Sequence, residues 1–397
     1  MPTSRRQFLR TAAITVGSLP FAQIGARAQA PVRPGRPVLV TVFLRGAMDS
    51  LGVVARPADR DYQRLRPSLG LVPPDASAPE NTRSVLLEGA YALHPNLTPL
   101  LTHRDSLTAL VGTGLPRPLR SHFDAQLVME RFGARASELR EDGWLTRVAA
   151  GLPDRSPTAA VAIGTALPHS LARADAVTYT DRRRVRGGRD AEALFRQLYA
   201  EGRDDGAQRD IRDTGRRGLE TLAHFRALAA AADRESGFGN DPLSRALRTV
   251  SSLIRGDDTV QLVNVDHGSW DTHRNQRGML GQRTRELGTA LSAFWQSLGR
   301  HRERVVLATL TEFGRTAAPN GTAGTDHGWG SAMFVLGTRT ERRVLGAPAY
   351  GASDLEAGRD LRVTIDYRDV LAEIATAHLG LPAQALGGPR ERVGLFA

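Results

Sequence analysis

Val38–Leu44 reads VLVTVFL, a continuous apolar run that is rich in β-branched residues. A run of this length and composition is typical of a central strand that is buried on both faces of a parallel sheet. The loop that follows, Arg45-Gly46-Ala47-Met48-Asp49-Ser50, contains a glycine and ends in a carboxylate and a hydroxyl. The same pairing of an apolar run with a polar loop recurs along the chain.

Further apolar runs predict five more strands, and helical patterns lie between them. The predicted strands cover 107–111, 159–163, 260–265, 305–310 and 332–336. Helices are expected over 121–132, where Ser121 is placed as the N-cap, over 276–298 and over 366–379. Strands that alternate with helices predict an α/β fold with a doubly wound, mostly parallel sheet and helices on both of its faces.

The first thirty residues have the three parts of an export signal. Ser4-Arg5-Arg6-Gln7-Phe8-Leu9-Arg10 carries the twin arginines, an apolar stretch follows over 11–24, and small residues stand at 26, 28 and 30. We therefore predict a twin-arginine signal peptide over 1–30, recognised by the twin-arginine export machinery, and a periplasmic or secreted mature protein. The alternative is a cytosolic chain with a chance arginine pair.

The mature chain, 31–397, is expected to form a single α/β domain. Helical periodicity within 165–258 suggests a helical cap or insertion over the sheet. Beyond the signal peptide no apolar run is long enough for a transmembrane segment.

Composition limits the chemistry. The chain has no cysteine, which excludes disulfides and thiolate ligands, so any metal must be held by oxygen and imidazole groups. The net charge is +11, and all the basic residues are arginines, which reflects either compositional bias or attraction to anionic substrates. Because the arginines are interspersed with acids and no nucleic-acid-binding motif is present, we expect no nucleic-acid partner.

Acids, hydroxyls and histidines follow five of the predicted strands. They are Asp49, Ser121, His122, Asp266, His267, Asp271, His273, Glu312, Asp326 and His327. In open parallel sheets the carboxyl ends of the strands form one edge, where ligands bind. Carboxylates and neutral imidazoles are ligands for divalent ions such as zinc, manganese or calcium. The pattern therefore predicts a divalent metal site at this edge.

Spacing permits a chelate without deciding its members. Asp271 and His273 are two residues apart and can face the same way in an extended loop, whereas His267 and Asp271 would share a face in a helical one. Each candidate also has a purely structural interpretation. The loops around Asp271 and His327 could be polar turns, Asp49 and Ser121 could cap helices, and Glu312 could be a surface carboxylate paired with Arg315.

Several longer motifs occur in an order that resembles the exported bacterial family known as domain of unknown function 1501. They are 43–49 (FLRGAMD), 121–126 (SHFDAQ), 142–145 (DGWL), 270–273 (WDTH), 311–316 (TEFGRT), 325–328 (TDHG) and 366–371 (DYRDVL). That family is grouped with the alkaline phosphatase and sulfatase superfamily. The resemblance implies a doubly wound sheet with metals at the strand ends.

The resemblance also implies roles for individual residues. Asp49, Asp271, His273 and His327 match metal ligands, and Ser121 lies near the place of a nucleophile. Glu312-Phe313 stands where the superfamily usually has an Asp-His pair, which puts a second metal site in doubt.

These patterns lead to a functional hypothesis with one rival. We expect an exported metal-dependent hydrolase that acts on phosphate or sulfate esters, with an anionic small molecule or glycan ester as substrate. Ser121 and His122 are the predicted catalytic residues. The predicted metal ligands are Asp49, Asp271, His273, Glu312 and His327, with Asp266, His267 and Asp326 in reserve. The alternative is a non-catalytic envelope or glycan-binding protein of the same fold.

Overall fold

The computed structural model describes residues 35–153, 156, 158–179, 212, 215–216, 218–221, 223–224, 227–228, 230 and 236–396. The predicted signal peptide, 1–30, lies outside these residues and stays a prediction. Within the described part, no helix combines the length and the apolar character that a membrane crossing requires.

Nine strands of the described part form one sheet. They are β1 (Val38–Leu44), β5 (Leu107–Gly114), β6 (Ala160–Ile163), β7 (Val177–Tyr179), β8 (Leu262–His267), β9 (Val305–Leu310), β10 (Ser331–Leu336), β11 (Val344–Leu345) and β12 (Ile365–Asp366). The order is β11-β5-β10-β9-β1-β8-β6-β7, and β12 also pairs with β5. Of the strand pairs in this sheet, β10 with β5 and β10 with β9 are antiparallel, and the others are parallel. The predicted mostly parallel sheet is confirmed.

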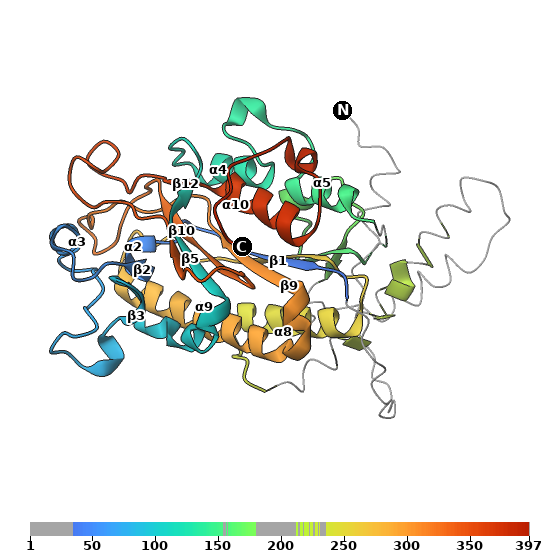
Figure 1. Cartoon of the computed structure of the whole chain (residues 1–397), viewed down its shortest axis with the longest axis horizontal. Coiled ribbons are helices and arrows are strands. Elements are labelled where there is room, and N and C mark those ends of the chain that lie inside the picture. Colours follow the sequence, from blue (N-terminus) through green and yellow to red (C-terminus); the bar gives the residue numbers. More distant parts are fainter. Residues whose placement is uncertain are drawn as a thin grey trace.

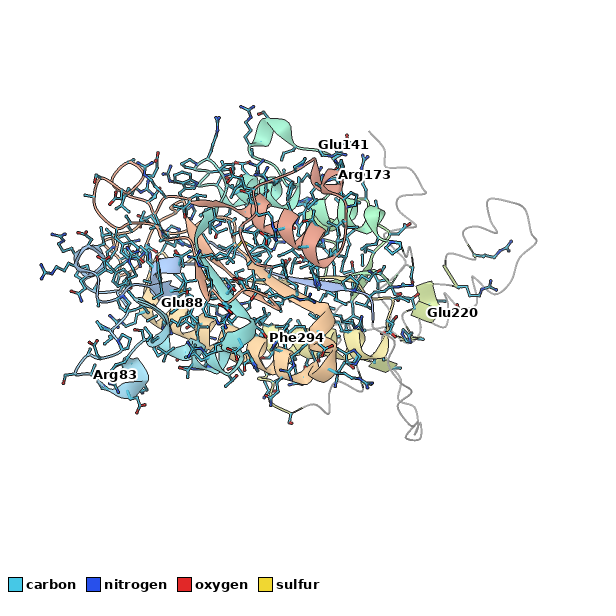
Figure 2. The ribbon with its side chains drawn as sticks, in the orientation of Figure 1. Arg83, Glu88, Glu141, Arg173, Glu220 and Phe294 are labelled. Atoms are coloured by element: carbon cyan, nitrogen blue, oxygen red, sulfur yellow. The ribbon has the colours of Figure 1, made fainter. Side chains whose placement is uncertain are left out.

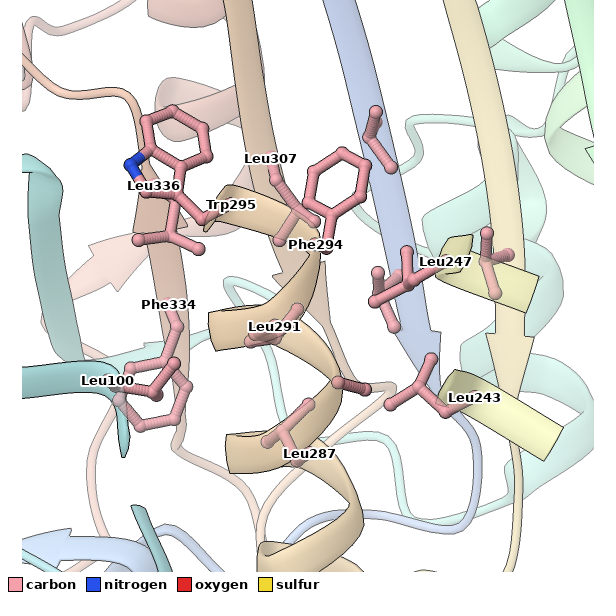
Figure 3. Close-up of a cluster of buried hydrophobic side chains, with 14 of the residues drawn as sticks. Leu100, Leu243, Leu247, Leu287, Leu291, Phe294, Trp295, Leu307, Phe334 and Leu336 are labelled. Carbon is pink, nitrogen blue, oxygen red and sulfur yellow. The ribbon is translucent and has the colours of Figure 1, made fainter. Parts of the chain in front are cut away.

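Helices cover one face of the sheet along its length (Figure 1). α8 (Pro242–Gly256), α9 (Gln276–Ser297) and the 3-10 segment η2 (Pro95–Ser106) pack there against side chains of β1, β9 and β10. Figure 3 shows this layer, where Leu287, Leu291 and Phe294 of α9 lie between Leu100 of η2 on one side and Leu243 and Leu247 of α8 on the other. Burial of these side chains is the main stabilising contribution of this layer.

The opposite face carries a second hydrophobic layer. α4 (His122–Glu130), α5 (Trp144–Gly151) and α10 (Tyr367–Glu373), which continues into the π-helical turn η7 (Ile374–His378), cover it. β1 feeds both layers, because Val40 and Val42 point into the first core and Leu39 and Phe43 into the second. This alternation explains why β1 is apolar at every position.

Shorter elements complete the described chain. A small sheet has the order β2-β4-β3, with β2 (Val54–Ala55), β3 (Val85–Glu88) and β4 (Tyr91–Leu93), beside the helices α2 (Ser50–Val53) and α3 (Arg60–Leu65). The 3-10 turns are η1 (Glu80–Thr82), η3 (Ala136–Glu138), η4 (His169–Leu171), η6 (Gly299–Arg304) and η8 (Ala383–Leu386). Charged pairs such as Glu141 and Arg173 lie at the periphery, in contrast to Phe294 (Figure 2).

All six predicted strands are present, with one change that affects the site. The strand predicted over 260–265 is β8, which runs two residues later because Asp266 and His267 continue the pairing with the last residues of β1. Of the range predicted as a cap, 165–258, the described part contributes β7 to the sheet and α8 to the first helical layer. Most of its remainder lies outside the described residues.

Candidate metal centre

The topology brings five polar segments to one edge of the sheet. β1, β5, β8 and β9 are oriented alike, so the loops that follow them leave at the same edge. β10 is reversed, and the loop that precedes it, containing Asp326 and His327, therefore enters at this edge as well. This is the edge at which parallel sheets bind ligands.

His122, Asp271 and His327 form the centre of this edge. Each offers one ligand atom, and these atoms all lie within 4.8 Å of one another. Asp271 is 3.5 Å from Nε2 of each of the two histidines. Nε2 of His122 is buried and has no hydrogen-bond partner. An unpartnered ring nitrogen beside a carboxylate and a second imidazole is a suitable donor set for a divalent cation.

Both histidines are held in the tautomer that a metal ligand requires. Nδ1 of His122 lies 2.8 Å from Oε1 of Glu312, and Nδ1 of His327 lies 2.8 Å from the carbonyl oxygen of Arg120. Because each neighbour is an acceptor, Nδ1 carries the hydrogen and Nε2 of the neutral ring keeps its lone pair. Such partners behind a ligand are characteristic of metal-binding histidines.

Glu312 lies behind His122 and is fully buried. Its Oε1 also accepts hydrogen bonds of 2.8 Å from the Gly46 amide and from Nε2 of Gln126. Burial alone would raise the pKa of this carboxyl, but the hydrogen bonds from His122 and Gln126 hold it below its ordinary value. The interpretation of Glu312 as a surface carboxylate is therefore wrong.

The bond to Glu312 also affects the imidazole. It raises the pKa of His122, against the effect of burial. A more basic ring is a stronger electron donor to a cation. Burial instead lowers the pKa of His327, so its ring is neutral over a wider pH range.

His273 lies on the more open side of the centre. Its Nδ1 is 3.0 Å from Oδ1 of Asp326, and its Nε2 is 3.0 Å from Oδ1 of Asp271 and 2.9 Å from Nε2 of His327. Since the carboxylate of Asp326 accepts the hydrogen on Nδ1, Nε2 of His273 carries a lone pair. This lone pair, that of Nε2 of His327 and one of Oδ1 of Asp271 point toward one another. N–H groups of Arg315 face Asp271 and His273, and a proton or a metal ion between the three atoms would relieve the repulsion that is left.

Arg315 is the residue of this centre that the sequence did not identify as functional. Its side chain is fully buried, and its guanidinium pairs with Asp271. Burial would raise the pKa of Asp271, but the hydrogen bond and charge of Arg315 lower it. Nothing in the spacing of Arg315 marks this role, because its partners come from three loops far apart in the chain.

Three predicted ligands are engaged elsewhere. Asp49 forms a buried two-point ion pair with Arg66, at 2.6 and 2.7 Å, and makes no side-chain cap of α2. Asp266 is paired with Arg45 at 2.9 Å. Nε2 of His267 donates to the carboxylate of Glu286 at 3.0 Å, on the side of the sheet covered by α9.

Ser121 is the N-cap of α4, as predicted, and precedes His122 directly. Its hydroxyl accepts from the amide of Asp124 at 3.5 Å, a long bond for a cap. Two arginines near this edge are already paired with carboxylates, since Arg45 also contacts Glu130 and Arg120 contacts Asp360.

A pocket of about 230 Å³ adjoins the centre. Two of its lining residues contact the histidines of the centre. Asp326 is hydrogen-bonded to His273, and Arg359 donates to the carbonyl of His327. Its other lining residues are Leu65, Thr316, Ala317, Ala318, Pro319, Asn320, Leu355 and Gly358. The pocket therefore has one acidic and one basic group in a wall that is both polar and apolar.

Comparison with known proteins places this chain in a family. The family model described as "Protein of unknown function (DUF1501)" matches residues 89–390, which include His122, Asp271 and His327. The chain belongs to the DUF1501 family. This DUF1501 protein has no match among curated proteins.

Solved structures of three proteins are among those that resemble the DUF1501 protein at low similarity. The C-terminal periplasmic domain of EptC from Escherichia coli, in complex with Zn, is 8% identical and covers 76% of this chain and 72% of its own, with a TM-score of 0.35. Ps i-CgsB is 11% identical and covers 89% of this chain and 74% of its own, with a TM-score of 0.38. A second structure of Ps i-CgsB, in complex with k-i-k-neocarrahexaose, is 10% identical over the same shares of the two chains, with a TM-score of 0.37. A mutant of TAB5 alkaline phosphatase with Mg bound is 8% identical, with coverages of 76% and 91% and a TM-score of 0.31.

Proposed function

We propose that this protein is an exported, metal-dependent hydrolase of phosphate or sulfate esters. The observation that carries the proposal is the convergence of His122, Asp271 and His327, whose ligand atoms lie within 4.8 Å of one another. The acceptors behind both Nδ1 atoms support it, because they leave the Nε2 lone pairs for a cation. His273, at the open side, is a further ligand candidate.

The residues of this edge have different roles in the proposed reaction. A divalent cation bound here would polarise an ester oxygen. Glu312 orients His122, and Asp326 orients His273, through the bonds to their Nδ1 atoms. Ser121 stands at the first turn of α4, where unpaired backbone N–H groups favour an anion, and its weakly bonded hydroxyl attacks or positions the ester.

The rival function, a non-catalytic envelope or glycan-binding protein, has one observation in its favour. Arg45 and Arg120 are both committed to carboxylates, so neither guanidinium is free to neutralise a phosphate or sulfate group. In that case the centre would bind a structural cation or none.

Metal content and ester turnover test the proposal together. The protein, purified without chelator and supplemented with Zn²⁺, Mn²⁺ or Ca²⁺, should hold metal, and His327→Ala should lose it. His301→Ala is the matched control, because His301 is half-buried on η6, outside the centre. Chromogenic phosphate and sulfate esters should be hydrolysed by the parent and not by Ser121→Ala.

Each outcome has a distinct meaning. Metal with turnover supports the hydrolase. Metal without turnover on any ester would favour the binding protein, and absence of metal under every condition would refute the metal-dependent proposal.

A further inference from the structure

Arg315 is tied into the candidate centre through every nitrogen of its guanidinium. Nε donates to the carbonyl of Ala47 at 2.9 Å, and Nη1 donates to the carbonyl of Thr325 at 3.1 Å. Nη2 donates to the carbonyl of Gly46 at 2.8 Å and to the carboxylate of Asp271. The second N–H of Nη1 faces Nε2 of His273 at 3.4 Å, so all five donors are directed at protein groups and Arg315 acts on the centre through Asp271 rather than by binding substrate.

The carboxylate of Asp271 is divided between two sides. Oδ1 faces Arg315 and lies 3.0 Å from Nε2 of His273. Oδ2 faces the unpartnered Nε2 of His122 at 3.5 Å. Nη1 of Arg315 also approaches Nε2 of His273, at 3.4 Å. A permanent positive charge therefore stands on the Asp271 and His273 side of the centre.

We infer that this centre takes a single divalent cation and that Arg315 supplies the second positive charge. The inference rests on the proposed metal-dependent function and specifies its metal stoichiometry. One ion fits against His122, His327 and Asp271, whose ligand atoms converge. A second ion on the other side of Asp271 would stand beside the guanidinium.

Two physical properties of Arg315 exclude that second ion. A guanidinium does not lose its proton in proteins, so the repulsion cannot be relieved by titration. The side chain is fully buried and bonded to main-chain carbonyls of Gly46, Ala47 and Thr325, so it cannot move aside without breaking the loops that form the centre. Like charges this close repel strongly in a partly buried site.

The inference is tested by counting ions. Native mass spectrometry of the protein titrated with Mn²⁺ should saturate at one ion per chain, and electron paramagnetic resonance should show an isolated Mn²⁺ rather than a coupled pair. Two ions per chain with a coupled spectrum would overturn the inference while leaving the metal-dependent function intact. No bound ion would overturn the proposed function, and the inference with it.

Two variants separate the charge of Arg315 from its structural bonds. Arg315→Gln removes the charge and should admit a second ion that binds more weakly than the first. Arg315→Lys keeps the charge and should still bind one ion. A Gln variant that is folded by circular dichroism and still saturates at one ion would refute the role of the charge. If that variant does not fold, the ion count and spectrum of the parent decide the inference alone.

Discussion

Replacing Glu312 with Gln should weaken metal binding while leaving the fold in place. Oε1 of Glu312 accepts from His122, Gln126 and the Gly46 amide, and Oε2 faces the hydroxyl of Thr311 at 3.3 Å. In Glu312→Gln the amide oxygen can keep the first three bonds. The new NH₂ group can donate to Oγ1 of Thr311, whose own hydrogen goes to the carbonyl of Leu44. The substitution therefore removes the negative charge and little else.

The expected loss follows from what the carboxylate does for His122. Its hydrogen bond raises the pKa of the imidazole and fixes Nε2 as the free nitrogen. Mutation of a partner behind a metal-binding histidine typically costs 10–100-fold in metal affinity, or about 1.4–2.8 kcal/mol. We expect the dissociation constant for Zn²⁺ or Mn²⁺ to rise by that factor.

Competition titration with a metal-binding dye at fixed pH measures this constant. Glu286→Gln is the matched control, because the half-buried Glu286 pairs with the buried His267 at 3.0 Å in a second carboxylate–histidine contact that is outside the centre. It should leave the metal affinity unchanged. Equal affinities in the parent and in Glu312→Gln, or equal losses in both variants, would refute the reasoning that Glu312 tunes His122.

Three further predictions concern the stability of the fold. Arg66→Met should lower the free energy of unfolding by about 3–5 kcal/mol in urea titrations, because it leaves the carboxylate of Asp49 buried without its cation. Burial lowers the pKa of both His94 and His378 to about 4. Between pH 6.5 and pH 4 the unfolded chain therefore binds more protons than the folded chain. As the pH falls through that window, the free energy of unfolding should decrease by about 3 kcal/mol for each histidine, which urea titrations at stepped pH would measure. Glu373→Gln should cost about 2–4 kcal/mol and speed amide hydrogen exchange over 393–396, since its carboxylate accepts four backbone N–H groups there.

Each of these predictions has a result that would contradict it. Arg64→Met removes an exposed ion pair and should cost less than about 1 kcal/mol, so a cost as large as that of Arg66→Met would contradict the argument from burial. The pH slope should largely vanish in His94→Gln/His378→Gln, and an unchanged slope would assign it to other groups. Unaltered exchange over 393–396 in Glu373→Gln would show that the C-terminal segment is held by its apolar contacts instead.

Local pattern was enough for the fold. The positions of the strands β1, β5, β6, β8, β9 and β10 follow from short apolar runs, because a strand buried on both faces needs an apolar side chain at nearly every position. β7, β11 and β12 of the large sheet were not predicted, and β7 lies in the range expected to form a helical cap. Each has two or three residues, and a pairing this short leaves no period in the sequence.

The centre was predictable only in outline. The sequence indicated the edge of the sheet and the residue types, and the structure brings together His122, Asp271, His273 and His327 from the set it named. The sequence did not distinguish these four residues from Asp49, Asp266 and His267, which are of the same residue types and lie in the same kind of loop. Glu312 and Asp326 lie behind histidines, a distinction that spacing does not contain.

The sequence by itself thus determined the α/β architecture and the kind of chemistry available at one sheet edge, because hydrophobic period and residue type are local properties. Only the tertiary structure decided which carboxylates are free to act. Asp49 is neutralised by Arg66, whereas Asp271 is shared between Arg315 and the histidines. Which carboxylate is neutralised depends on the positions of the buried guanidinium groups of Arg66 and Arg315. Each is held by hydrogen bonds to a loop more than two hundred residues away in the chain.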